Sequence, residues 1–521
     1  MAINGVSGSS YIGAGILDLR NQLDTLSQQL ASGKISNTYS GQGTGRSLAI
    51  GLRSQLSGLA GYADTAVNLN TRIGVANLSL QQLANTISSV KAAAVSAGST
   101  LDNTGQTAGQ KTASLGFFNS VDMLNAQSGD RYLFSGRATN TAPVTAANVI
   151  MDGNGAAIAG LKQVIAERKI ADLGTNLNGR VGSAVGTPVT SVRVTEEDAS
   201  PAPPLLAQQF GLKLSAISTS IAGATVTQPV DLPATVPPAL PATPVQKSMS
   251  VDLGANNPRV GDQVKFTFNL PDGTSEDIVM TASDKTPLAA NSFLIGADPT
   301  ATAANLNTEL TKSIKSLANG PLVAASAMEA GDNFFDQPPM RVSGTPLGAA
   351  TALVAGTSAN TVIWYNGETN SAANGSARGS AVAQVDQAIT VQYGARADEQ
   401  ALRTELQNVA VFAAVTTSAT DPNANAQIAA LKQRVAQNLA TIPGTQTIQD
   451  IQADFAGAQA SIKATTDRQT QTKAITQTML DSIEGINPDE VATKILALQT
   501  ALQASYQTTS KLYQMSLVKF L

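Results

Sequence analysis

The feature that most constrains the fold is an apolar seam with heptad spacing near each end of the chain. Near the N-terminus the gaps between apolar residues are 4, 3, 4, 3 and 4, through Ile12, Ile16, Leu19, Leu23, Leu26 and Leu30. Near the C-terminus the gaps are 4, 3, 4, 3, 4 and 3, through Val491, Ile495, Leu498, Leu502, Ser505, Thr509 and Leu512. Such spacing puts one narrow stripe on a polar helix, which is typical of helices that pack on partner helices. An amphipathic helix packed on its own core is the alternative.

Both seams are too narrow to stabilise isolated helices. We therefore expect the two ends to pair with each other and with further copies of the chain, as a ring or a helical array. A pair repeated around an axis without closure gives a tube or filament. The residues predicted to carry this self-assembly are Ile16, Leu19, Leu23, Leu26, Leu30, Ile495, Leu498, Leu502 and Leu512.

Composition excludes several classes of function. The 521 residues include no His and no Cys, which excludes Ser-His-Asp and Cys-His catalysis, His or Cys zinc sites and thiol redox chemistry. Lys and Arg number 33 against 37 Asp and Glu, a net charge of −4, whereas proteins that bind nucleic acid or anionic membranes usually carry a basic excess. We expect no enzyme activity, cofactor, metal, nucleic acid or membrane partner. Neither a membrane-spanning helix nor a cleaved secretory signal is expected.

Helical periodicity dominates both ends of the chain, whereas the middle shows proline-rich linkers and the alternating pattern of β-strands. Helices are predicted over residues 48–97, 105–124 and from 398 onward, with a short aromatic strand at 131–136. Residues 199–244 contain proline-rich linkers around one short helix. Alternating apolar residues predict a hairpin over 264–280, covered by a helix at 301–317, and further strands at 361–365 and 389–393.

The predicted fold class is mainly α with an inserted α+β part, in which long terminal coiled-coil helices form a stalk and the middle domain is β-rich. Residues 1–45 and 484–521 are the two coiled-coil segments, 46–144 and 396–483 the two halves of a helical rod, and 145–395 the inserted middle with its linkers.

Three motifs resemble those of bacterial flagellins. Residues 30–36 (LASGKIS), a loop of small residues and residues 45–50 (GRSLAI) resemble the N-terminal signature of that superfamily, and residues 498–506 (LQTALQASY) resemble its C-terminal signature. The resemblance covers about residues 1–140 and 395–521. Residues 129–136 (GDRYLFSG) resemble the hook–filament junction branch, the L-type hook-associated protein 3, as do 364–368 (WYNGE) and 391–394 (VQYG).

The resemblance implies a structural subunit that joins hook to filament. Such a subunit is exported through the flagellar type III channel, is secreted, and belongs to the extracellular flagellum. Its implied partners are a flagellar export chaperone on the C-terminal helix, another hook-associated protein and flagellin.

Two other functions stay open. The length of 521 residues is ordinary for a flagellin that forms the filament itself and long for a junction protein. The third hypothesis is an enzyme or carbohydrate-binding module within residues 145–395. Its candidate acidic residues are Asp252, Asp262, Glu276 and Asp277.

Overall fold

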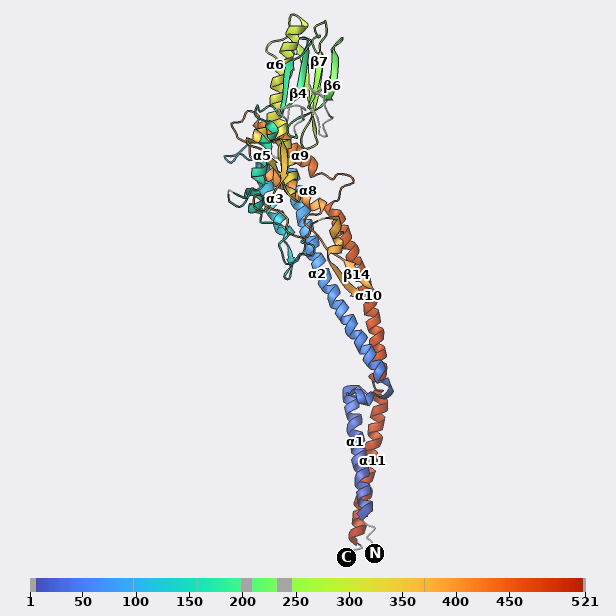
Figure 1. Cartoon of the computed structure of the whole chain (residues 1–521). Coiled ribbons are helices and arrows are strands. Elements are labelled where there is room, and N and C mark those ends of the chain that lie inside the picture. Colours follow the sequence, from blue (N-terminus) through green and yellow to red (C-terminus); the bar gives the residue numbers. More distant parts are fainter. Residues whose placement is uncertain are drawn as a thin grey trace, which may run out of the picture. The chain divides into compact units, whose positions relative to one another are not determined.

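The computed structural model describes residues 6–96, 98–155, 157–197, 209–231, 246–369 and 371–518. Long helices occupy both ends of the sequence and several small sheets lie in its middle (Figure 1). The chain is therefore mainly α with an inserted α+β part, as predicted. Its contacts divide it into two compact units: residues 1–70, 383–391 and 457–521 form the first, and residues 71–382 and 392–456 form the second.

The helices include three for which no helix was expected, in residues 147–152, 161–173 and 323–335; the others lie close to their predicted ranges. The helices are α1 Val6–Ser32, α2 Arg46–Ser96, α3 Ala108–Leu124, α4 Ala147–Asp152, α5 Leu161–Leu173, α6 Pro299–Leu317, α7 Val323–Phe335, α8 Gln400–Ala414, α9 Ala424–Asn438, α10 Ile448–Glu484 and α11 Pro488–Val518. Shorter helical turns are η1 Tyr39–Gly45, η2 Ala318–Leu322, η3 Leu347–Ala349, η4 Ala372–Asn374 and η5 Arg378–Ser380.

The strands gather into five small sheets. They are β1 Gln127–Ser128, β2 Arg131–Tyr132, β3 Val181–Val185, β4 Ser191–Glu196, β5 Lys213–Thr219, β6 Thr225–Asp231, β7 Lys247–Asp252, β8 Gln263–Asn269, β9 Ser275–Ser283, β10 Ser292–Leu294, β11 Met340–Ser343, β12 Ala352–Ala355, β13 Val382–Asp386 and β14 Ile389–Gln392. The two larger sheets have the orders β10-β9-β8-β5 and β3-β4-β7-β6, and β1-β2, β11-β12 and β13-β14 are two-stranded.

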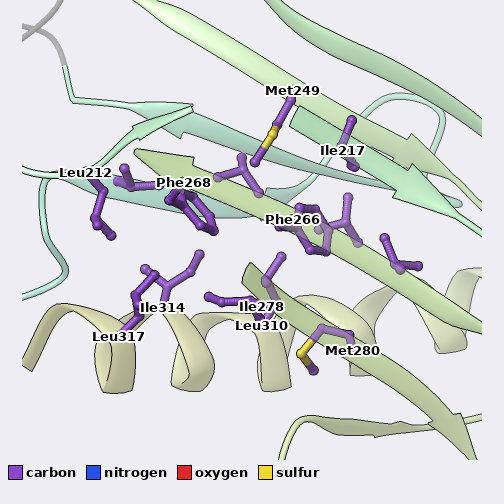
Figure 2. Packing of buried hydrophobic residues seen from close by; sticks show 14 of the residues in the cluster. Leu212, Ile217, Met249, Phe266, Phe268, Ile278, Met280, Leu310, Ile314 and Leu317 are labelled. Carbon is purple, nitrogen blue, oxygen red and sulfur yellow. The ribbon is translucent and has the colours of Figure 1, made fainter. Parts of the chain in front are cut away.

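In the second unit, one hydrophobic core joins both four-stranded sheets to α6. The predicted hairpin is present: β8 and β9 are antiparallel, and Phe266 is opposite Ile278. Phe266 and Phe268 are fully buried, and α6 turns Leu310 and Ile314 toward the strands (Figure 2). The alternating pattern therefore predicted this layer correctly, including the covering helix, because one face of each strand had to be apolar.

A helical layer completes the second unit. Helix α3 packs on α8, and α7 packs on α5, α8 and α9. Trp364 is buried against the end of α7, where its indole Nε1 donates to the Phe335 carbonyl at 2.9 Å and its ring centroid lies 5.1 Å from that of Phe335. The tryptophan thus packs without leaving its polar atom unpaired.

The first unit has a small core of its own. Ala49, Leu52 and Leu480 are buried where the start of α2 meets the end of α10. The β13–β14 hairpin is held on α10: the Gln469 side chain donates to the Val385 carbonyl at 2.6 Å, and Arg468 pairs with Asp386 at 2.5 Å.

Three local predictions are wrong. The described part of the proline-rich segment contains no short helix; residues 209–231 hold strands β5 and β6, and the flanking residues 199–208 and 232–244 lie outside the described residues. Strand β5 pairs with β8, a partner remote in sequence that local pattern cannot reveal. Strand β6 tolerates Pro229 because it is at the edge of its sheet and its register shifts there.

The other two errors concern aromatic segments. Of the strand predicted at residues 131–136, only Arg131–Tyr132 is a strand, and Ser135 makes a single bridge to Arg396. Residues 361–365 are no strand either, because only Thr361 and Tyr365 form isolated bridges. Phe134, Trp364 and Tyr365 are buried by packing outside any strand, so aromatic content was a poor guide to strand here.

Candidate functional site: the paired terminal helices

Local sequence features fix the start of α11 and the end of α1. The Asn487 side chain accepts hydrogen bonds from the backbone N–H groups of Asp489 at 3.1 Å and Glu490 at 3.4 Å, so it caps α11, and Pro488 occupies the first helical position. At the other end of the pair, α1 stops at Ser32 because Gly33 adopts a φ of +68°, which favours glycine.

The two helices contact each other within the first unit and run antiparallel. The chain leaving α1 pairs with the chain entering α11 through an antiparallel bridge between Lys34 and Gly485. Ile35 N–H donates to the Glu484 carbonyl at 2.8 Å, and Ile486 N–H donates to the Gly33 carbonyl at 3.2 Å. We call residues 33–35 with 484–486 the terminal knot. It lies at one end of the helix pair (Figure 1).

The structure places most predicted assembly residues on the less exposed side of the pair. Leu502 is buried, and six others are half-buried: Ile16, Leu19, Leu23, Leu26, Ile495 and Leu498. The remaining two, Leu30 and Leu512, are 41% and 49% exposed. Pairing of the two ends thus covers the seams only in part.

Further apolar side chains on the same two helices lie in solvent. Leu17 on α1 is 62% exposed and Leu496 on α11 is 64% exposed, and each directly follows a seam residue. Tyr11 and Tyr506 are exposed as well. The two helices alone therefore leave these apolar side chains in solvent, where a further partner could cover them.

A buried carboxylate within the knot, that of Glu484, was missed by sequence reasoning. The Glu484 side chain is 5% exposed. It accepts hydrogen bonds from Arg53 at 2.6 Å and from Gln42 at 3.1 Å, and Lys34 forms an ion pair with it at 3.6 Å. The hydrogen bond from Arg53 holds the pKa of Glu484 below its usual range, and Glu484 in turn raises the pKa of Arg53. Arg53 also donates to the Tyr39 hydroxyl at 3.3 Å.

This cluster joins the loop after α1, the start of α2 and the end of α10. Arg53 and Glu484 are 431 residues apart, so no local spacing connects them. Gly45 lies close to the same point, where an added Cβ would come within 2.8 Å of Ile483. Gly45 is the one sequence signal for this contact, because a residue without a Cβ allows the chain to approach Ile483 closely.

The carboxylates considered for a catalytic or carbohydrate site are engaged in structural contacts. Asp252 accepts from Thr190 at 2.6 Å, Asp262 accepts from the Arg259 N–H at 2.8 Å, and Asp277 pairs with Lys265 at 2.7 Å. Glu276 lies 3.4 Å from Arg434. Among the described residues, no three or more Asp and Glu side chains converge to form a possible metal site.

Comparison with known proteins adds no identity: no protein-family model matches this sequence, and no curated protein does. No helix within the described ranges is long and apolar enough to cross a membrane.

Proposed function

We propose that this chain is a structural subunit of the bacterial flagellum, assembled through its two terminal helices, and that it joins hook to filament. The observation that carries the proposal is the antiparallel pairing of α1 with α11, which leaves Leu17, Leu496 and Tyr506 exposed. Further copies packed around a common axis would cover this surface. Burial of apolar area supplies about 25 cal/mol per Å², and ordering the helices opposes it.

The segments that carry the flagellin resemblance support the same proposal. Residues 30–36 end α1 and enter the terminal knot, and residues 45–50 begin α2 beside Ile483. The motif therefore falls where the first and last parts of the chain meet. This is where a subunit built from its two ends needs fixed geometry.

The proposal includes the route by which the subunit reaches its place. The chain is secreted through the flagellar type III channel, with an export chaperone covering the C-terminal helix until assembly. Its neighbours in the flagellum are another hook-associated protein and flagellin. A chaperone on α11 would protect the apolar side chains that pairing leaves exposed.

The decisive experiment is electron microscopy of the purified chain with and without isolated hooks. A short ring on the hook end supports the junction protein, and long polymers from the chain alone support the alternative, a filament flagellin, which its length favours. Deletion in the parent bacterium separates the two as well: loss of a junction protein releases flagellin into the medium, and loss of the flagellin removes the filament. A chain that stays monomeric in both settings contradicts both assignments.

Substitutions on α1 and α11 test whether assembly depends on these two helices. Leu23→Ser with Leu498→Ser is expected to abolish hook capping or polymerisation. Leu115→Ser is the matched control, because Leu115 is 70% exposed on α3 in the second unit. Equal loss of assembly in the control would show that surface apolarity in general, and not the terminal pair, drives association.

A further inference from the structure

A cationic pocket lies in the second unit. It has a volume of about 350 Å³ and is lined by the residue 72–76 part of α2, residues 131–139, residues 380–382, residues 393–395 and Phe455. Arg72, Arg131 and Arg137 line it, and no Asp or Glu does.

Three arginines in one pocket stand out in this chain. Lys and Arg together are 33 of 521 residues, so the sixteen residues of the lining would hold one cation by composition alone. The pocket holds three, in a protein whose net charge is −4. Like charges repel, so such a concentration is unfavourable unless an anion offsets it.

Among the described residues, one of the three arginines is neutralised by an acidic partner. Arg137 pairs with Glu368 at 2.7 Å, and Glu368 itself is almost buried behind Gly136. Arg72 donates to the Tyr393 hydroxyl at 3.2 Å, which is a neutral partner. Within the described ranges, neither Arg72 nor Arg131 makes an ion pair, so the pocket keeps two positive charges in excess.

We propose that this pocket binds an oxyanion group, such as a phosphate or a carboxylate, between Arg72 and Arg131. Guanidinium groups present paired N–H donors that match the oxygens of such anions. Tyr393 adds to the donor set, because its hydroxyl accepts from Arg72 and keeps its own O–H to donate. The anion is either a free ion or an acidic side chain of a second copy of this chain.

The ordinary structural explanation is weaker here. Arginine stems often cover apolar surface while the charged end stays in water. That explains one exposed arginine, but it does not explain why three arginines from α2 and from residues 131–137 meet at one hollow that contains no acid.

The test is titration of the full chain with inorganic phosphate, with ionic strength held constant by chloride. One saturable site per chain is expected, and Arg131→Gln is expected to weaken binding at least about tenfold, the effect of losing about 1.4 kcal/mol. Arg72→Gln should act alike. Arg259→Gln removes the same charge from an exposed loop of the same unit and should leave the affinity unchanged.

Arg131→Gln is the principal variant because Arg131 is exposed, so its loss should leave the fold intact; an unchanged melting curve in phosphate-free buffer checks this. If phosphate does not saturate a site on the unaltered chain, or if it binds Arg131→Gln equally well, the proposal is overturned.

A second arm distinguishes the sources of the anion. If Arg131→Gln loses phosphate binding but associates normally, the ligand is a free ion. If it also weakens self-association, and phosphate inhibits association of the unaltered chain, the ligand is an acid of a second copy. The phosphate arm does not depend on the flagellar proposal, so either can fail without the other.

Discussion

The core of the second unit and the terminal helix pair use the same apolar residue types with opposite results. In the core, Phe266 and Phe268 on β8 are fully buried between sheet and helix. On the helix pair, Leu23 and Leu498 are half-buried and Leu17 is 62% exposed. One region completes its packing within a single chain, and the other needs a neighbour. Stability of the monomer should therefore depend on the first region, and assembly on the second.

The sharpest test of this contrast is a large-to-small substitution in each region. Phe266→Ala is expected to lower the free energy of unfolding by about 3–5 kcal/mol, because it opens a cavity at a fully buried site. Leu17→Ala should change it by less than about 0.5 kcal/mol, since the side chain is mostly in solvent. Urea unfolding of the monomer measures both. Equal losses would erase the distinction between the regions.

Breaking a buried ion pair in the second unit should lower the free energy of unfolding more than breaking an exposed ion pair in the first unit, and the difference should be somewhat smaller than for the apolar substitutions. Arg434 on α9 is 4% exposed and lies 2.6 Å from Asp272, which is 7% exposed. Arg434→Ala strands a buried carboxylate and should cost about 3 kcal/mol. Lys463→Ala breaks an exposed pair on α10 in the first unit, at 3.0 Å from Asp467, and should cost less than about 0.5 kcal/mol. A loss below 1 kcal/mol for Arg434→Ala, from the same unfolding curves, would contradict the expected burial penalty.

The second unit also contains a carboxylate that opposes its stability at neutral pH. Burial raises the pKa of Glu405 on α8 to about 7, and its Oε2 has no hydrogen-bond partner among the described residues. The folded state holds this proton more tightly than the unfolded chain, so stability is full below the unfolded pKa near 4.5 and falls as pH rises toward 7.

Glu405→Gln removes that penalty. It should raise the free energy of unfolding by about 2 kcal/mol at pH 8 and leave it nearly unchanged at pH 4. Glu309→Gln, on α6 of the same unit, is the control for loss of a negative charge. A pH-independent effect of Glu405→Gln would show that desolvation of the carboxylate is not its cause.

The smallest expected effect is local and belongs to the first unit. The pKa of Glu484 is lowered by Arg53, so its contribution is fully present above the unfolded pKa of about 4.5 and is lost as pH falls through the lower folded pKa. Protection of the Ile35 amide from hydrogen exchange, corrected for intrinsic rate, should therefore fall several-fold as the pH drops below that window.

Glu484→Gln should show the lower protection at every pH. Glu490→Gln, three residues into α11 and exposed, should behave as the unaltered chain does. Protection that stays constant through the acid range in the unaltered chain would remove Glu484 from any role in closing the knot.

Sequence predicted those elements whose partners are near in the chain or whose pattern is long. The long terminal helices and the β8–β9 hairpin are of this kind, and each was found where expected. Strand β5 and the Arg53–Glu484 pair were missed because each is completed by a residue far along the chain. The pocket of arginines was missed for the same reason, since it collects side chains from segments that show no common motif.

The antiparallel direction of α1 and α11 has a mechanical consequence. Drawing apart the ends of α1 and α11 that lie far from the knot loads the pair at one edge and peels it open one turn at a time, which takes little force at each step. The peeling stops at the two backbone hydrogen bonds of Ile35 and Ile486, which the Arg53–Glu484 contact backs. The knot therefore holds the last contacts of the pair to open when its far ends are drawn apart.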